Sequence, residues 1–596
     1  MNPLAVRVRR TGASIGATLD GPATAAAGDL ALAWDGRIDN REELGTRAGL
    51  APTEVARLTD ESLLLSVYAR LGVDALAHIA GDYAFALWDR RERVLLCARD
   101  PLGQRPLFYY LSSSTFVAAS SVAGVLAHGD VPRLPNEGVV AEYLLGSMAT
   151  RDETLFAGVR RLLPGAWIRV DHTAERHGTI AWVDPHAEIR YRREQDYAEH
   201  LRDLLRVSVR ARLRGAEHIG VELSGGLDSS TVAAIARDEL GVEAPERLRL
   251  MSLVFPGLAC DERRLIDACH RAWRLPADVV EAGGHAAAST AGDSRHLDFP
   301  AYPNGTMSSG LRRRAKAAGV RVILTGIGGD EWFTGSRYHC ADAIRRGRLV
   351  DGLRQGRIDA ELEPGVSAAH AAWTYGVLPV VPPGIKRLAR RIHPARAAVA
   401  PWIAAGFTAR VDLAGRLRSR PPVPAFPTAA QTEMFRSAIG GWAIHGTEME
   451  ARQAAEIGIE LRHPLADLRI ARFGLAIPEA QRWSGRERKR VLRAAAAGLV
   501  PDLVRLQASK VDFTPILVQA LEAQGGAAFF EHLGTAALGW VQPEPLARMY
   551  ADMRSEYAAG DPRYMEAAWV LWMIAGVERW ARAAGFASPP RARATA

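Results

Sequence analysis

A turn rich in glycine and small polar residues lies between an apolar run and a helical pattern. The members of this turn that can contact an anion are Ser224, Gly225, Gly226, Asp228 and Ser229. The apolar run over 219–223 predicts a buried strand, and the apolar spacing over 229–237 predicts a helix. Glycines let a backbone approach an anion closely, and the free N–H groups that begin a helix point toward it. The stretch therefore predicts a phosphate-binding loop. It is not of the Walker type, because no Gly-Lys-Ser/Thr follows.

A second glycine turn, which contains Gly326, Gly328 and Asp330, follows the apolar run 320–324. Ligands of an open parallel sheet bind beyond the carboxyl ends of its strands, so we expect Asp228 and Asp330 to face one phosphate site. Mg²⁺ takes one or two carboxylates together with phosphate oxygens. The two aspartates are therefore predicted metal ligands, although either one alone is also a typical helix cap.

The predicted elements divide the chain into two domains, 1–190 and 191–596. Short apolar runs separated by turns, with one helix over 59–71, predict an α+β layered domain first. From residue 219 onward strands and helices alternate, which predicts an α/β domain with a doubly wound parallel sheet. The segment 341–430 is rich in Arg and Pro and irregular in pattern. It is read as a solvated loop and helix, with a peptide-docking face as the alternative.

The composition is that of an ordinary soluble protein. The chain has 596 residues, 48% of them hydrophobic, and a formal net charge of +8, which is weak support for an anionic partner in so long a chain. The start lacks the apolar core of a secretory signal, and no apolar run reaches membrane-spanning length. Four cysteines (Cys97, Cys260, Cys269 and Cys340) have neither metal nor redox spacing. A reduced, cytoplasmic protein without a membrane span is expected.

Several stretches resemble one known family. The sequences GDYAFALWD at 81–89 and ARDPLGQRPL at 98–107 resemble the N-terminal glutaminase domain of asparagine synthetase B. The SGGLDS loop resembles the pyrophosphate loop of ATP pyrophosphatases. The stretches 460–467, 489–493 and 509–513 resemble the family's C-terminal motifs. The resemblance implies an Ntn-type glutaminase-like domain followed by an ATP-pyrophosphatase-type synthetase domain, with ATP and Mg²⁺ as cofactors.

The glutaminase chemistry of that family does not carry over to this chain. The family hydrolyses glutamine with an N-terminal cysteine, whereas residue 2 here is Asn2 and the first cysteine is Cys97. The family's glutamine-binding Asn-Gly-Glu reads Asp35-Gly36-Arg37. A carboxamide cannot replace a thiolate as nucleophile, and an arginine inverts the charge that would hold the substrate's ammonium. Asp60 is retained but is read as a helix cap, so the first domain is interpreted as catalytically inactive.

The resemblance also implies roles for residues in the second domain. Lys510 would stabilise the charge of a tetrahedral intermediate and pyrophosphate, and Glu460, with Tyr338 or His339, would take a proton from an attacking amine. A simple ion pair of Glu460 with Arg462 or Arg452 is the alternative. Leu253 and Val254 fall where the family's adenine pocket lies, although strand packing explains them equally well.

One position bears on the choice of nucleophile. In asparagine synthetases a glutamate that handles ammonia follows the first glycine of the second motif, and here that residue is Ile327. An isoleucine cannot move a proton, which disfavours ammonia and favours an amine already present in the substrate. Two branches of the family use such an amine, the β-lactam or carbapenam synthetases and the lasso peptide cyclases. In length, in the long Arg/Pro-rich segment and in motif wording the chain resembles the lasso peptide cyclases more. These enzymes adenylate an Asp or Glu side chain and close a macrolactam with the peptide's N-terminal amine.

Other readings remain open. A β-lactam or carbapenam-type synthetase of small molecules and a glutamine-independent amidase of the asparagine synthetase type share the same motifs. A non-catalytic scaffold and a tRNA- or nucleotide-modifying enzyme are further alternatives. The cyclase reading implies a precursor peptide as substrate, a leader-binding protein and a leader peptidase as partners, and no nucleic acid.

Overall fold

A computed structural model describes residues 4–11, 14–21, 23–282, 296–300, 303–361, 367–382, 384–385, 400–418, 421–507 and 511–588. Two positions singled out in the sequence, Asn2 and Lys510, lie outside the described residues. Every helix within the described ranges is too short or too polar to traverse a lipid bilayer.

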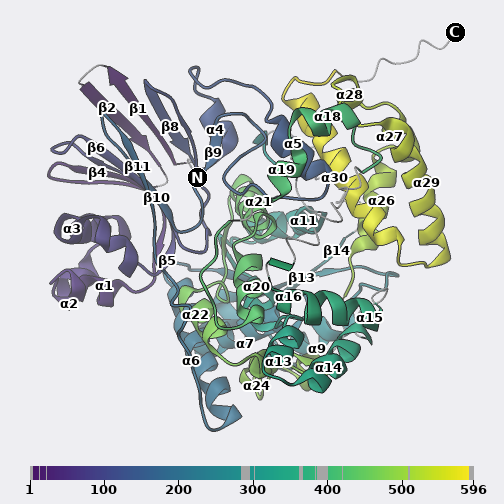
Figure 1. Cartoon of the computed structure of the whole chain (residues 1–596). Coiled ribbons are helices and arrows are strands. Elements are labelled where there is room, and N and C mark those ends of the chain that lie inside the picture. Colours follow the sequence, from purple (N-terminus) through teal and green to yellow (C-terminus); the bar gives the residue numbers. More distant parts are fainter. Residues whose placement is uncertain are drawn as a thin grey trace.

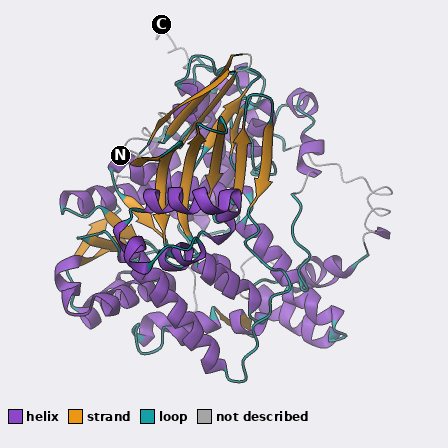
Figure 2. Cartoon of the chain, turned by 90° about the vertical axis from the view of Figure 1, so that its left-hand side faces the viewer, coloured by secondary structure: helices purple, strands orange, loops and turns teal. Residues whose placement is uncertain are grey.

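The first domain is a sandwich of two antiparallel sheets with helices on its outer faces (Figures 1 and 2). The first sheet, in the order β2-β1-β8-β7-β9, consists of β1 (Ala5–Thr11), β2 (Ser14–Asp20), β7 (Phe108–Leu111), β8 (Thr115–Ala119) and β9 (Val159–Arg161). The second, in the order β11-β10-β6-β5-β4-β3, consists of β3 (Ala23–Ala27), β4 (Leu30–Ile38), β5 (Gly81–Asp89), β6 (Val94–Arg99), β10 (Ala166–Val170) and β11 (Glu175–Thr179). The helices of this domain are α1 (Arg41–Arg47), α2 (Pro52–Arg57), α3 (Asp60–Leu71), η1 (Gly72–His78), α4 (Val122–Leu126) and α5 (Glu137–Leu144).

Strand β5 shows why both faces of the second sheet are covered. Its side chains alternate between two hydrophobic cores, as a pleated strand requires. Tyr83, Phe85 and Leu87 pack in the core that holds side chains of α1 and α3. Ala84 and Trp88 pack in the core shared with the first sheet. The predicted layered α+β domain is confirmed.

The second domain is built on a five-stranded parallel sheet in the order β14-β13-β12-β15-β16. Its strands are β12 (Ile219–Glu222), β13 (Leu248–Val254), β14 (Ala277–Glu281), β15 (Val322–Leu324) and β16 (Glu460–Arg462). The chain runs outward from β12 to β14 and then returns to the other side of β12. This reversal creates a switch point between β12 and β15, where ligands of such sheets bind. The predicted doubly wound parallel sheet is confirmed.

Helices surround this sheet and continue beyond it (Figure 1). Those up to the second glycine turn are α6 (Glu194–Leu213), α7 (Leu227–Leu240), η2 (Gly241–Glu243), α8 (Ala244–Arg247), α9 (Arg263–Trp273), α11 (Pro303–Ala317) and α12 (Gly329–Phe333). The middle group is α13 (His339–Arg345), α14 (Leu349–Glu361), α15 (Ala368–Ala371), the π-helix η4 (Ala372–Val377), α16 (Leu378–Val380), α18 (Ala405–Arg410), α19 (Leu413–Arg418), α20 (Ala429–Ala438) and α21 (Gly441–Ile457). The last group is α22 (Leu468–Ala476), α23 (Glu479–Arg482), the hairpin β17 (Trp483–Ser484) and β18 (Glu487–Arg488), α24 (Arg490–Ala495), α25 (Asp502–Arg505), α26 (Thr514–Ala523), α27 (Gly526–Glu531), α28 (Gly534–Ala537), α29 (Pro543–Ala559) and α30 (Tyr564–Ala583). The described part of 341–430 is thus more helical than its irregular pattern predicts, and Pro382 follows the end of α16.

Buried ion pairs join the two domains. Arg212 of α6, whose side chain is 1% exposed, contacts Asp39 at 3.2 Å and Asp82 at 3.3 Å in the first domain. The same guanidinium lies 2.9 Å from Asp467, which precedes α22 in the second domain. A buried charge is costly unless it is paired and hydrogen-bonded, so these four groups depend on one another.

A second buried group of charges lies at the other side of the interface. Glu448 of α21 lies 2.7 Å from Arg99 of β6 and 2.7 Å from Arg161 of β9. Two arginines of the first domain thus share one carboxylate of the second. Because breaking either cluster would leave a charge buried without its partner, the clusters fix how the two domains pack.

Replacement of Arg212 tests this interface. We expect Arg212→Met to lower the free energy of unfolding by about 3–5 kcal/mol, because it removes the shared cation and leaves buried carboxylates under-compensated. The matched control is Arg210→Met on the same helix, whose side chain is 71% exposed where it pairs with Glu239. That exposed pair should contribute about 1 kcal/mol or less. Urea unfolding of both variants measures the difference, and equal losses would contradict the interpretation.

Candidate active site

The two predicted glycine turns meet at the carboxyl ends of β12 and β15. In the first turn, the hydroxyls of Ser224 and Ser229 lie 3.1 Å apart, and Ser229 Oγ accepts a hydrogen bond from the Ser224 N–H at 3.2 Å. The Gly226 N–H donates to Ser224 Oγ at 3.2 Å. Gly225 has φ +83°, a conformation that favours glycine. The turn is therefore held open by its own serines before any ligand arrives.

The glycines of the second turn let it approach the first closely. A Cβ added at Gly326 would lie 2.7 Å from the Ser229 nitrogen, and one added at Gly329 would lie 2.3 Å from the Asp228 carboxyl carbon. Gly328 has φ +105°, and its N–H donates to the Glu331 carboxylate at 3.0 Å. Any larger residue would separate the two turns. The structure thus brings together the predicted residues Ser224–Ser229, Gly326, Gly328 and Asp330.

Lys489 lies between the two predicted metal ligands. Its Nζ is 2.6 Å from an Asp228 oxygen and 2.8 Å from an Asp330 oxygen. Burial by itself would lower the pKa of Lys489, but the two carboxylates raise it above its usual value. The pair of carboxylates is therefore close enough to share one cation. Lys489 was not predicted as a site residue, although the Lys-x-x-Leu-Arg match at 489–493 was the signal that could have found it.

A pocket of about 180 Å³ lies beside the first turn, between β13 and α11. Its lining is mostly apolar and consists of Glu222, Leu223, Ser224, Met251, Leu253, Phe255, Cys260, Glu262, Met307, Ser308, Leu311 and Phe513. Leu253 lines the pocket as predicted. Val254 does not line it and is fully buried, because successive side chains of β13 point to opposite faces of the sheet. A flat apolar ring fits this composition.

Glu262 is the acidic group of this pocket that sequence reasoning missed. It lies where the first turn meets α9, and its Cβ would be 3.4 Å from a Cβ added at Gly225. Burial raises the pKa of its carboxyl to about 7. An ionisable group near neutrality beside a phosphate-binding turn can couple ligand binding to pH. No sequence motif distinguished it.

Glu460 lies at the amino end of β16, whereas the two turns follow the carboxyl ends of β12 and β15. It is the first residue of β16 and pairs in register with Val322, the first residue of β15, whereas the second turn follows the last residue of that strand. Its carboxylate is held by Arg105 at 2.5 Å and by Arg462 at 2.9 Å. Burial would raise the pKa of Glu460, but the neighbouring arginines hold it well below its usual value. The prediction that Glu460 takes a proton stays a prediction, and its pairing with two arginines counts against it.

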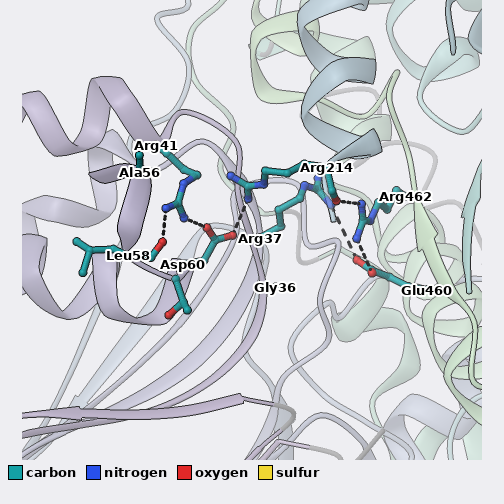
Figure 3. Close-up of a pocket in the computed structure, with 10 residues that line it drawn as sticks. Gly36, Arg37, Arg41, Ala56, Leu58, Asp60, Arg214, Glu460 and Arg462 are labelled. Carbon is teal, nitrogen blue, oxygen red and sulfur yellow. Dashed lines mark hydrogen bonds and ion pairs between the residues drawn. The ribbon is translucent and has the colours of Figure 1, made fainter. Parts of the chain in front are cut away.

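Glu460 instead lines a second cavity, of about 430 Å³, between the two domains (Figure 3). The cavity is lined by Gly36, Arg37, Arg41, Ala56, Leu58, Thr59, Asp60, Arg214, Glu460 and Arg462. It contains the positions at which the sequence resemblance places glutamine binding. Asp60 does not cap α3, since Thr59 does so, and it pairs with Arg41 and with Arg214 at 2.8 Å.

The arginines of this cavity neutralise its acids. Arg37 donates to Asp39 at 2.6 Å and to Asp82 at 2.8 Å, and both of its partners are buried. Arg41 and Arg214 occupy the carboxylate of Asp60, which would otherwise be the group available to an ammonium. The charge pattern therefore opposes the binding of a free amino acid's ammonium group, in agreement with the reading of Arg37.

Three further residues were predicted at the site: Ile327, Tyr338 and Lys510. The structure describes the first two. Ile327 lies in the second turn, with its N–H donated to Thr325 Oγ1 at 3.2 Å. Tyr338 is the N-cap residue of α13, with its ring 5.7 Å from that of Tyr375, and its part in proton transfer stays a prediction. Lys510 lies outside the described residues, and its role stays a prediction as well.

Comparison with known proteins gives the same two-domain division. A profile of the family described as asparagine synthase matches residues 200–582, and one described as a glutamine amidotransferase domain matches residues 13–180. The chain is 27% identical over 306 residues to "Amidase chyE" of Penicillium rubens, which covers 48% of this chain and 44% of that protein. It is 28% identical over 225 residues to "Asparagine synthetase [glutamine-hydrolyzing] 3" of Bacillus subtilis, covering 37% and 36%.

These matches span less than half the length of the curated relatives. The family profile, in contrast, covers well over half of this chain and includes both glycine turns, Lys489 and the parallel sheet that positions them. By this match, together with the switch-point site and the glutaminase-like first domain, the chain belongs to the asparagine synthase family, whose members use ATP.

Proposed function

We propose that this protein is an ATP-dependent lasso peptide cyclase, which joins the N-terminal amine of a peptide to an Asp or Glu side chain and releases AMP and pyrophosphate. The observation that carries the proposal is a contrast between two sets of residues. The turn 224–229 and the acids Asp228 and Asp330 are intact and meet at one site. Ile327 and Arg37, in contrast, stand where ammonia and glutamine would be handled.

The first turn would bind the pyrophosphate portion of ATP, and the apolar pocket beside it would take the adenine ring. Asp228 and Asp330 would hold Mg²⁺, because their oxygens already converge on one cation, Lys489. Bound there, the ion would neutralise phosphate charge. Lys489 would contribute a second positive charge beside the ion, in a partly buried setting where such charges act more strongly than in water.

The chemistry would proceed in two steps. A side-chain carboxylate oxygen of the peptide attacks the α-phosphorus, and pyrophosphate leaves with the electrons of the broken P–O bond. The peptide's amine then attacks the acyl carbon, AMP leaves, and the amine gives up a proton. Because both reacting groups belong to one bound peptide, their effective molarity reaches about 10⁵ M or more when they are well oriented. Lys510 is proposed to stabilise the charge of the tetrahedral intermediate.

A second candidate is an amidase acting on a different carboxylate, and the similarity to proteins named amidases favours it. It shares the adenylation step and differs in the amine that is used. A β-lactam or carbapenam-type synthetase differs only in the size of the substrate. Only the cyclase proposal includes a precursor peptide, a leader-binding protein, a leader peptidase and a cytoplasmic location.

The decisive experiment supplies ATP, Mg²⁺ and a leader-free precursor peptide with an internal Asp or Glu. We expect a product lighter by one water, with AMP and pyrophosphate formed alongside it. Acetylation of the N-terminal amine should stop lactam formation and leave some AMP formation, because activation and closure are separate steps. Replacing the acceptor carboxylate by an amide should stop both. ADP as product, or loss of water that survives acetylation, would overturn the proposal, and a carboxamide formed only on adding ammonia would favour the amidase.

Replacement of Lys489 tests the shared cation. We expect Lys489→Met to slow ATP-to-AMP turnover by about 10²–10³-fold, the loss typical of one preorganised charge at a reacting centre. The matched control is Lys316→Met on the exposed side of α11, which should keep the wild-type rate. Pyrophosphate exchange measures the activation step alone. A Lys489→Met rate within a few-fold of the control would mean that the ammonium only balances charge in the ligand-free protein.

The carboxyl of Glu262 predicts a pH dependence of nucleotide binding. Its pKa of about 7 means that it is neutral at lower pH and becomes an anion beside the phosphate turn above neutrality. Binding of an anionic nucleotide favours the protonated form, so the Kd for ATP should rise as the pH increases from 6 to 8. Glu262→Gln should remove this dependence and leave the affinity near its low-pH value. The control is Glu281→Gln, whose side chain is 69% exposed. Equal slopes for both variants, measured by calorimetry, would contradict the assignment.

A further inference from the structure

Three side chains with different metal-binding atoms converge at the open end of the α13–α14 helical hairpin. His339 and Cys340 begin α13, and Asp359 lies near the end of α14. The His339 nitrogen, the Cys340 sulfur and an Asp359 oxygen all lie within 4.8 Å of one another. We propose that these residues form a structural binding site for a divalent transition metal, with Zn²⁺ as the preferred ion and a water as fourth ligand.

The types of the three ligands favour Zn²⁺ over the Mg²⁺ of the nucleotide site. Imidazole nitrogen and thiolate sulfur are ligands of zinc, whereas Mg²⁺ takes oxygen atoms. A thiolate and a carboxylate carry two negative charges, which match the charge of the ion and leave the site neutral. Binding replaces the Cys340 thiol proton by the metal and releases that proton to solvent.

The distances fit a small tetrahedral ion after a minor adjustment. His339 Nε2 is 2.8 Å from Asp359 Oδ2, and Cys340 Sγ is 3.7 Å from the same oxygen. Two ligand atoms each about 2.0 Å from a tetrahedral zinc lie about 3.3 Å apart, so the nitrogen and oxygen would separate by about half an ångström. Rotation of the imidazole about its side-chain bonds supplies that movement. The separation of the sulfur from the Asp359 oxygen already suits a shared ion, and the sulfur lies within 4.8 Å of the imidazole nitrogen.

The surroundings of the cluster are those of a buried site. The side chains of His339 and Asp359 are 11% and 2% exposed, and Cys340 is 1% exposed. Asp359 is contacted by His339, Cys340 and Gln355, and the cation of Arg488 is close enough to interact electrostatically with its carboxylate. The partial exposure of His339 leaves one side from which an ion can enter.

Neighbouring groups hold the ligands as outer partners of a metal site do. Gln355 donates to the other oxygen of Asp359 at 2.7 Å, which leaves Oδ2 directed at the two remaining ligands. The same amide donates to the Gly485 carbonyl at 3.0 Å. The ring of Trp483 lies 4.8 Å from the imidazole of His339. Such outer contacts fix ligand orientation and raise affinity.

Through these contacts, a bound ion would affect the position of Lys489. Trp483 and Gly485 belong to the β17–β18 hairpin, and Lys489 follows its last residue directly. A bound ion would tie α13, α14 and this hairpin together and thereby hold Lys489 in place between Asp228 and Asp330. The site shares His339 with the candidate proton acceptors but uses no residue of the nucleotide site, so the spectroscopic test below does not depend on the cyclase proposal.

Cobalt substitution tests the site directly. Protein stripped with a chelator is titrated with Co²⁺, and absorption is recorded in the visible and near-ultraviolet. We expect one equivalent to give the intense bands of tetrahedral cobalt and a thiolate-to-cobalt charge-transfer band. The bands should be lost in Cys340→Ser and kept in Cys269→Ser, a second buried cysteine that contacts only the hydroxyl of Ser230 in the described hydrogen bonds. Co²⁺ held by Asp228 and Asp330 has oxygen ligands and cannot give the thiolate band.

Two further measurements distinguish loss of the metal site from misfolding of a variant. The wild-type protein should carry about one zinc per chain after purification without chelator, and stripping it should lower the melting temperature reversibly. Asp359→Asn, which preserves shape, should weaken Co²⁺ binding at least tenfold, the loss typical of a changed ligand or its support. Absence of a thiolate band in the wild-type protein, or its persistence in Cys340→Ser, would overturn the proposal and leave an ordinary hydrogen-bonded His–Asp pair.

Discussion

The structure of the site depends on the close approach of two backbone turns that have no room for side chains. Gly326 and Gly329 face Ser229 and Asp228 at distances that no Cβ could occupy, and Gly328 faces the backbone of Leu465 in the same way. This contact sets the separation of Asp228 and Asp330, and that separation in turn decides whether one cation can serve both. The parallel sheet determines where the two turns lie. The glycines, which have no side chains, allow the turns to approach to contact distance. A single alanine at any of these positions would alter the charge geometry without touching a charged residue.

Local patterns predicted the elements that carry the site. The strand, turn and helix over 219–240 follow from an apolar run, two glycines and helical spacing, which are all short-range signals. Their arrangement at a switch point follows from the alternation of strands and helices. Lys489 also stood in a recognised motif. Its partners could not be predicted, because they come from segments more than 150 residues away in the chain.

Three features of the site region could not be reached from the sequence, for physical reasons. Val254 was assigned to a pocket together with its neighbour, but the pleat of β13 sends adjacent side chains to opposite faces. Glu460 matched a motif, which does not reveal at which end of a strand its acid lies. Its pair with Arg462 was one of the alternatives, whereas its pair with Arg105 of the first domain is a long-range contact that the motif does not show. The cysteines have no metal spacing in the sequence, and Cys340 meets Asp359 only because the turn after α13 reverses the chain. For Glu460 and Cys340 the missing information was the pairing of polar groups that lie apart in the chain. Local sequence patterns do not reveal such pairs.

The first domain contributes to the packing of the protein, independently of any glutamine chemistry. Its residues Asp39, Asp82, Arg99 and Arg161 form buried ion pairs with the synthetase domain, and Arg105 holds Glu460 on β16. Removing the domain would take both arginine partners from Glu448 and two of the three carboxylates from Arg212, which would keep Asp467. A substitution such as Arg37, which opposes glutamine binding, adds to this network instead, because it pairs with Asp39 and Asp82. Arg37 thus opposes the charge of a glutamine ammonium and also pairs with the two aspartates that contact Arg212.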